Sequence, residues 1–198
     1  LDAAERGELS TPEGVANHAW RMLRDERASG QLARFHLEWL GLGGFDSLEK
    51  DSRRYPFFTV EARKAMKAET VAFVDTVIRR SDGRLETLLS APFTLAQEPS
   101  LRVYGIDPPT SFVPGLPTGL DPTQRAGILT QPAWLAAQAN ITTTSPVHRG
   151  LFVVTNLLCV QLGNPPPGVD LTPIGVDPTG QRSRRQRRPP RDSHRRCA

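Results

Sequence analysis

The fold is decided by residues 60–80, which read VEARKAMKAETVAFVDTVIRR. Apolar side chains recur along this stretch with the period of an α-helix and cover one wide face: Met66, Phe73, Val74, Val77 and Ile78. Thr59 precedes the stretch, where its hydroxyl can accept a hydrogen bond from a free backbone amide, and residues 81–83 (Ser-Asp-Gly) are a typical helix terminator. We therefore predict that the longest helix spans residues 60–80.

Two amphipathic helices are expected before this one. Thr11-Pro12-Glu13 predicts the start of the first, because a capping hydroxyl, a proline in the first turn and an acid near the helix N-terminus all favour it. We expect that helix to end near Ser29-Gly30. The second helix follows at once, and Gly41 should stop it. Its apolar stripe is Leu32, Phe35, His36, Trp39 and Leu40.

Helical patterning returns in the second half of the chain. Thr130-Gln131-Pro132 predicts the start of a helix that carries Trp134. Ser145-Pro146 repeats this pattern, and the helix it opens runs through residues 151–159, which are apolar on nearly all sides. We expect this to be the most buried helix of its unit, with Cys159 as an inert buried thiol. Strand signals are weak throughout.

The composition indicates a mainly α protein with two small helical units. Residues 107–122 hold five prolines and two glycines and read as a Pro-rich connection between a unit at residues 1–106 and a unit at residues 123–180. We expect two separate cores. The first would contain Trp20, Met22, Leu23, Phe35, Trp39, Met66, Phe73 and Val77, and the second would form around Leu151–Cys159 beside Trp134.

Charge is distributed unevenly along the 198 residues, whose net charge is +4. Residues 181–198 hold eight arginines and one aspartate, and the other 180 residues hold 17 Lys and Arg against 20 Asp and Glu. The body is therefore mildly acidic, and we expect a basic surface only at the C-terminal tail, which should be disordered. Contact with nucleic acid through this tail is one alternative; a solvated tail or the product of a reading-frame slip is the other, and we favour it because the tail lacks stacking aromatics.

Motifs for metal, phosphate or nucleophilic chemistry are missing from the sequence. It contains no H-E-x-x-H, no helical E-x-x-H, no paired C-x-x-C, no phosphate-binding glycine loop and no G-x-S-x-G. We therefore predict no catalytic and no metal-binding residue. No apolar run approaches the roughly 20 residues that a membrane-spanning helix needs, and the composition excludes a collagenous or coiled-coil rod.

Two ionisable residues lie on apolar helix faces. His36 falls between Phe35 and Trp39, where a histidine is either hydrogen-bonded within the core or a ligand that requires partners the sequence does not show. Glu69 falls between Met66 and Phe73, and if buried it must be paired. We expect a structural Arg–Glu bridge, with a catalytic acid of raised pKa as the alternative.

Several segments together carry a family resemblance. In the first half they are Arg21–Ala28, Phe35–Leu42, Tyr55-Pro56, Ala65-Met66 with Glu69-Thr70, and Val103–Gly105. In the second half they are Arg125–Gln131, Ser145–Gly150, Leu157–Cys159 and Pro165–Pro167. The first set resembles the bacterial family called domain of unknown function 1592, and the second resembles its usual neighbour, domain of unknown function 1588.

The resemblance implies a cellular setting but no reaction. Members of the family are typically large exported proteins that resemble c-type cytochromes, in which the second unit ends in C-x-x-C-H. It thus implies a periplasmic or cell-surface location, haem c in the full-length protein but none in this chain, and downstream domains as partners. Cys197 would be the first cysteine of an incomplete haem motif, since the second cysteine and the histidine are missing. The residues alone indicate instead an exposed free thiol.

These observations lead to one favoured function and one enzymatic alternative. We expect a non-catalytic helical scaffold or binding module, a fragment of an exported bacterial protein associated with haem electron transfer. The alternative is an uncharacterised enzyme with a site between the two helical units that uses Glu69, His36 or His148. Arg149, next to Gly150 at a helix start, is expected to hydrogen-bond loop carbonyls in a structural role.

Overall fold

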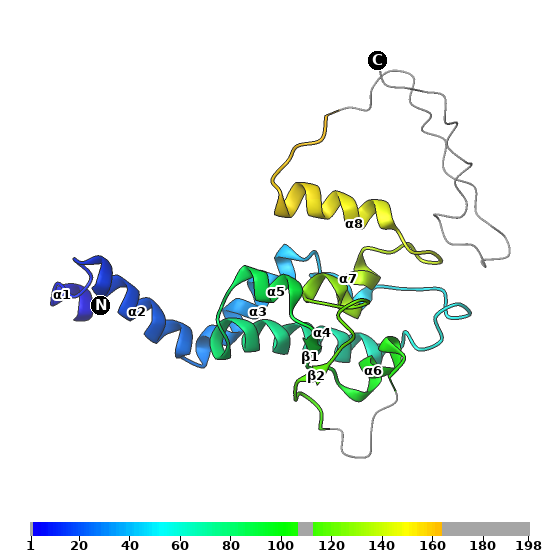
Figure 1. The fold of residues 1–198 in the computed structure, drawn as a ribbon, viewed down its shortest axis with the longest axis horizontal. Helices are drawn as coiled ribbons and strands as arrows, with labels where there is room; N and C mark the ends of the chain where they lie inside the picture. The colour runs from blue at the N-terminus through cyan, green and yellow to red at the C-terminus, as the bar shows by residue number, and fades with distance from the viewer. Residues whose placement is uncertain (1, 107–112, 164–198) are drawn as a thin grey trace. The chain divides into compact units, whose positions relative to one another are not determined.

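The computed structural model describes residues 2–106 and 113–163, and these are mainly α-helical (Figure 1). The α-helices are α1 (Asp2–Glu5), α2 (Pro12–Arg24), α3 (Arg27–Trp39), α4 (Val60–Asp75), α5 (Leu85–Ser90), α6 (Glu98–Tyr104), α7 (Pro132–Ala137) and α8 (Pro146–Phe152). Single turns are η1 (Phe45–Ser47), η2 (Thr76–Arg80), η3 (Ile128–Thr130) and η4 (Val153–Leu157), and the strands are β1 (Phe93–Thr94) and β2 (Thr118–Gly119). The predicted fold class is confirmed.

The long central helix forms as the sequence predicts. Helix α4 continues without a break into the π-helical turn η2, so that together they cover residues 60–80. The Thr59 hydroxyl accepts a hydrogen bond from the Ala62 amide at 3.2 Å and caps the helix N-terminus. Helices α3, α6 and α7 all contact α4. The central helix thus connects segments from both halves of the chain.

The hydrophobic core draws on both sides of the Pro-rich connection, which differs from the two separate cores expected. Its buried members include Leu40, Met66, Phe73, Val77, Leu88, Ile128, Trp134 and Phe152. The Phe152 ring lies 5.4 Å from the Trp134 ring and 6.0 Å from the Trp39 ring, measured between centroids. Residues 1–159 accordingly form one compact unit. Helical patterning shows which faces are apolar but not which faces meet, so this shared core was not predictable from it.

The two helices near the N-terminus are more exposed than expected. Trp20 and Met22 are 54% and 56% exposed, and Phe35 is 63% exposed. The prediction that these three side chains belong to the core is therefore wrong. Helix α2 buries none of its residues. The boundary between α2 and α3 also lies earlier than Ser29-Gly30, because the Asp25 carboxylate accepts a hydrogen bond from the Arg27 amide at 3.0 Å and starts α3 there.

Helix α8 is likewise less buried than its composition suggests. Ser145 caps it as predicted, but Phe152 is its one buried residue. Leu151 and Leu158 are 44% and 63% exposed. Cys159 is exposed and lies beyond the helical turns in the left-handed region with φ 53°, so the prediction of a buried thiol is wrong.

A short antiparallel pair and one glycine hold the second half against the first. Strands β1 and β2 pair Phe93 with Gly119 and Thr94 with Thr118. Gly127, at φ 65°, donates its amide to the Ala91 carbonyl at 2.9 Å. A Cβ atom at Gly127 would lie 2.1 Å from the Leu89 backbone, so only glycine fits this approach. The contact fixes η3, and with it the start of α7.

Some of the predicted segments extend beyond the residues that the structure describes. The predicted disordered tail at residues 181–198, with Cys197, lies outside the described residues, as do residues 164–180 at the end of the second predicted unit. The proline-rich connection is described from residue 113 onward and contains β2. Within the described ranges, no helix combines the length and apolar character needed to cross a membrane.

Candidate functional site

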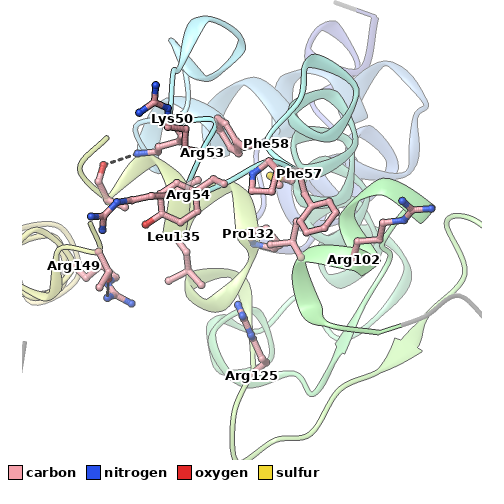
Figure 2. A pocket seen from close by; sticks show the side chains of 17 residues that line it. Lys50, Arg53, Arg54, Phe57, Phe58, Arg102, Arg125, Pro132, Leu135 and Arg149 are labelled. Atoms are coloured by element: carbon pink, nitrogen blue, oxygen red, sulfur yellow. Dashed lines mark hydrogen bonds between the residues drawn. The ribbon is translucent and has the colours of Figure 1, made fainter. Parts of the chain in front are cut away.

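A basic cleft is the feature of the fold best suited to bind another molecule. It has a volume of about 720 Å³ and is lined by segments from both halves of the chain: residues 50–58, α6, the loop before η3, α7 and the start of α8 (Figure 2). Six of its lining residues are basic: Lys50, Arg53, Arg54, Arg102, Arg125 and Arg149. Among the described residues, no Asp or Glu lines it.

The loop that supplies half of these cations is held by the loop before α8. The Lys50 ammonium donates hydrogen bonds to the Ala139 carbonyl at 2.7 Å and to the Asn140 carbonyl at 3.0 Å. The Asp51 amide donates to the Ile141 carbonyl at 3.2 Å. These contacts join segments about 90 positions apart in the sequence. They leave Arg53 and Arg54 exposed at the edge of the cleft.

Apolar side chains form the middle of the cleft. They are Pro56, Phe57, Phe58, Met66, Val103, Pro132 and Leu135. Phe58 is anchored edge-on against the buried Phe45, with ring centroids 6.1 Å apart. Figure 2 shows the guanidinium and ammonium groups arranged around Phe57, Pro132 and Leu135. The cleft therefore offers positive charge at its edges and an apolar surface between them.

The positive charge of the cleft is poorly compensated. Among the described residues, only Arg102 of the six has a carboxylate oxygen within 4.0 Å, that of Glu98 at 3.7 Å, and both side chains are more than half exposed. Arg125 donates to the Thr130 carbonyl at 3.0 Å, and its guanidinium lies 5.2 Å from the centre of the Tyr104 ring. Burial lowers the pKa of Lys50 below its usual value. An anion would thus find five cations that no carboxylate of the described residues already neutralises.

A buried carboxyl lies beneath Arg125. Glu69 is fully buried, and its Oε1 accepts hydrogen bonds from the Thr94 hydroxyl and, at 2.5 Å, from the Tyr104 hydroxyl. Its Oε2 has no hydrogen-bond partner in the part of the chain that the structure describes. Burial raises the pKa of Glu69, although the bonds from Thr94 and Tyr104 oppose the shift. The expected Arg–Glu bridge is therefore wrong: hydroxyl groups hold this carboxyl, and Arg125 contacts the ring of Tyr104 and the Thr130 carbonyl instead.

The predicted candidate residues do not converge on one site. His36 is buried, and its Nδ1 lies 2.8 Å from the Leu32 carbonyl oxygen, the contact of a hydrogen-bonded core histidine. His148 is exposed on α8. None of His36, Glu69 and His148 lines the basic cleft, whereas Arg149 does. Arg149 donates a hydrogen bond to the Thr144 hydroxyl rather than to the loop carbonyls expected.

The residues of this chain do not fit a covalently bound haem. Cys159 and Cys197 are its two cysteines, and they are too far apart in sequence to form C-x-x-C-H. Cys159 is exposed, and the imidazole of the buried His36 already contacts a backbone carbonyl. In the part of the chain that the structure describes, no three His, Cys, Asp or Glu side chains gather closely enough to hold a metal ion.

Sequence reasoning missed five of the six cations of the cleft. Lys50, Arg53, Arg54, Arg102 and Arg125 carried no prediction. The expectation of a basic surface only at the tail is wrong, because an average over the mildly acidic body hides a local cluster. One signal was available: residues 50–58 read KDSRRYPFF, in which basic and aromatic residues adjoin.

Each half of the chain matches a known protein family. The family described as "Protein of unknown function (DUF1592)", PSD4, matches residues 1–106, which is more than half of the chain. The chain belongs to this family. Residues 125–198 match a second family, PSCyt3, described as "Protein of unknown function (DUF1588)". The two occur in the order that the resemblance predicts. No curated protein and no solved structure matches the chain.

The basic cleft lies where the DUF1592 and DUF1588 segments meet. Lys50, Arg53, Arg54 and Arg102 belong to the first matched range, and Arg125 and Arg149 belong to the second. Neither segment alone supplies the whole set of cations. The packing of α7 against α4 and α6 brings the two contributions together.

Proposed function

We propose that this chain is a non-catalytic binding module that holds an anionic ligand in the basic cleft. The observation that supports this most directly is the gathering of six cations around an apolar surface, five of them without a protein carboxylate within 4.0 Å in the described residues. Like charges held near one another repel, so an anion that neutralises them gains more here than at an isolated surface arginine.

The two parts of the cleft would contact two parts of such a ligand. Guanidinium groups form strong, charge-assisted hydrogen bonds to carboxylate, sulfonate or phosphate oxygens. The apolar surface around Phe57 and Pro132 would cover an apolar body and remove it from water. A volume of about 720 Å³ lies within the range of roughly 300–1,000 Å³ typical of small-molecule sites.

Binding without chemistry is favoured by the position of the ionisable groups. A general acid or base must reach its substrate directly or through one water molecule. Glu69, the carboxyl with the raised pKa, is fully buried and does not line the cleft, and His18, His36 and His148 do not line it either. The described lining of the cleft therefore has groups that hold an anion but no histidine or carboxyl that could move a proton.

The family relationship supports a wider proposal for the protein that contains this chain. We propose that it is an exported bacterial protein in which a c-type haem domain follows the helical module, and that the module serves as a scaffold for it. Production of the full-length protein in a bacterium that exports it, followed by covalent haem staining and fractionation, tests this. Haem absent from the exported protein, or a cytoplasmic location, would contradict it.

Isothermal titration of the whole 198-residue chain with naphthalene-2-sulfonate tests the binding function. We expect binding that weakens as salt increases, because exposed cations contribute to it. Replacing both exposed arginines of the edge (Arg53→Gln with Arg54→Gln) should raise the dissociation constant by about tenfold or more, since each charge-assisted bond contributes roughly 1.5 kcal/mol. Arg84→Gln, also an exposed arginine but outside the cleft, is the matched control. Equal affinity of the double variant and the control would refute the proposal.

A further inference from the structure

We infer that the ligand of the basic cleft is an elongated dianion, with one anionic group at each end of a flat apolar body. This inference rests on the proposed binding function and adds the ligand's chemical class. It follows from how the cations and the apolar side chains are distributed within the cleft.

Five of the six cations lie at two ends of the cleft. Figure 2 shows Arg102 on one side, and Lys50, Arg53, Arg54 and Arg149 on the opposite side. Arg125 lies below the apolar middle. Leu135, Pro132 and Phe57 lie between the two sides. Arg102 comes from α6 and Arg149 from α8, so different elements place the two ends. A ligand that contacts both ends must extend across the apolar middle.

A single anionic group would satisfy only one end. A monoanion at the Arg54 and Arg149 end would leave Arg102 with its present partner, the exposed Glu98 carboxylate at 3.7 Å. Exposed ion pairs of this kind contribute little stability. A second ligand anion could therefore replace or share the Glu98 contact at small cost. Two anions, one at each end, neutralise both groups of cations.

The side chains in the apolar middle of the cleft favour a ligand with a flat apolar body. Phe57, Phe58 and Pro132 present ring faces or edges to the cleft, and Leu135 adds an aliphatic contact. Aromatic and proline rings are rigid, so they cover a planar ligand with little loss of side-chain entropy. Such a ligand would bury its body on these rings while its anionic groups stay partly hydrated at the ends.

Three naphthalene sulfonates share one apolar body and differ in the number and the positions of their sulfonate groups. Together they distinguish the effect of a second charge from the effect of where that charge lies. Naphthalene-2-sulfonate carries one anion, naphthalene-1,3-disulfonate carries two on one ring, and naphthalene-2,6-disulfonate carries them at opposite ends. Titration calorimetry of each against the whole chain should show the 2,6-isomer binding about tenfold more tightly than the other two, the value of one added charge-assisted contact.

Variants at the Arg102 end locate the second contact. Arg102→Gln should remove the advantage of the 2,6-disulfonate while leaving the affinity for the monosulfonate within about twofold, because the opposite end still holds one anion. Glu98→Gln should strengthen binding of the 2,6-isomer, since it removes a competing carboxylate. Both side chains are more than half exposed, so thermal unfolding should match the wild type and exclude a folding defect. Arg84→Gln again serves as the control.

The outcomes distinguish this inference from the proposed function. If the 1,3- and 2,6-disulfonates bind equally well, or if Arg102→Gln leaves the preference for the 2,6-isomer intact, the two-ended ligand is refuted while anion binding stands. If none of the three compounds binds, the proposed function fails as well. A preference for the 2,6-isomer that Arg102→Gln abolishes supports both.

Discussion

Replacement of the buried carboxyl should change how stability depends on pH. Glu69→Gln exchanges the carboxyl for an amide of the same shape that cannot ionise. The amide oxygen can accept the hydrogen bonds from Thr94 and Tyr104, and the amide nitrogen takes the place of Oε2, which accepts no hydrogen bond from any described residue. The variant should therefore fold, and it isolates the effect of ionising residue 69.

The direction in which the stability of the wild type changes with pH follows from the raised pKa of Glu69. Burial lifts it above its ordinary value of 4.5, so the folded protein holds this proton more tightly than the unfolded chain does. Above pH 4.5 the unfolded chain releases the proton first, and stability falls as the pH rises towards the folded pKa. The slope is at most about 1.4 kcal/mol per pH unit for one proton. Carboxylates with lowered pKa, such as Asp25 and Asp82, lose their contribution only as the pH falls below their ordinary value of 3.8, outside this window.

Urea unfolding followed by circular dichroism, at intervals from pH 4 to pH 8, measures the effect. The free energy of unfolding of Glu69→Gln relative to wild type should increase steadily above pH 4.5 and level off once the folded carboxyl is ionised. Glu69→Ala, which leaves two hydroxyls without an acceptor and opens a cavity, should cost about 3–5 kcal/mol near pH 4.5, and this cost should shrink as the pH rises because alanine cannot ionise either. A difference between Glu69→Gln and wild type that stays flat, or that shifts in favour of wild type as the pH rises, would show that Glu69 is ionised and paired.

Three further predictions concern packing and exposure. Gly127→Ala should lower stability by about 2–4 kcal/mol in thermal or urea unfolding, because its Cβ meets the Leu89 backbone at 2.1 Å; a loss under 1 kcal/mol would contradict that contact. Phe152→Ala should cost about 3–5 kcal/mol, since it empties the part of the core that lies against both Trp39 and Trp134, and a loss under 1 kcal/mol would contradict that packing. In a Cys197→Ser variant, the exposed Cys159 should react with Ellman's reagent without denaturant, and protection until unfolding would refute its exposure.

Local signals in the sequence predicted the helices well. Thr59, Thr11 and Ser145 each cap the helix that they were expected to start. A cap depends on one side chain and the three amides that follow it, so nearby residues suffice to predict it. The continuous apolar face of residues 60–80 likewise predicted the central helix and its burial.

Contacts between distant segments were not predictable from the same patterns. The apolar residues Trp20 and Phe35 have helical spacing, yet both are exposed, because spacing does not show whether a partner surface exists. The basic cleft joins Arg53 and Arg102 to Arg149 through contacts that cross half the chain. Whole-chain charge conceals such a cluster. The partner of Glu69 was missed for the same reason, since Thr94 and Tyr104 reach it from β1 and α6.

The location of the ligand is tested most directly by nuclear magnetic resonance of the ¹⁵N-labelled chain during titration with naphthalene-2,6-disulfonate. Saturable amide shift changes should gather at residues 50–58, at Arg102 and Val103, and between residues 133 and 149, and Arg53→Gln with Arg54→Gln should weaken them. Changes confined to the exposed apolar residues Trp20, Met22 and Phe35, or no saturable changes, would show that the basic cleft is not a binding site.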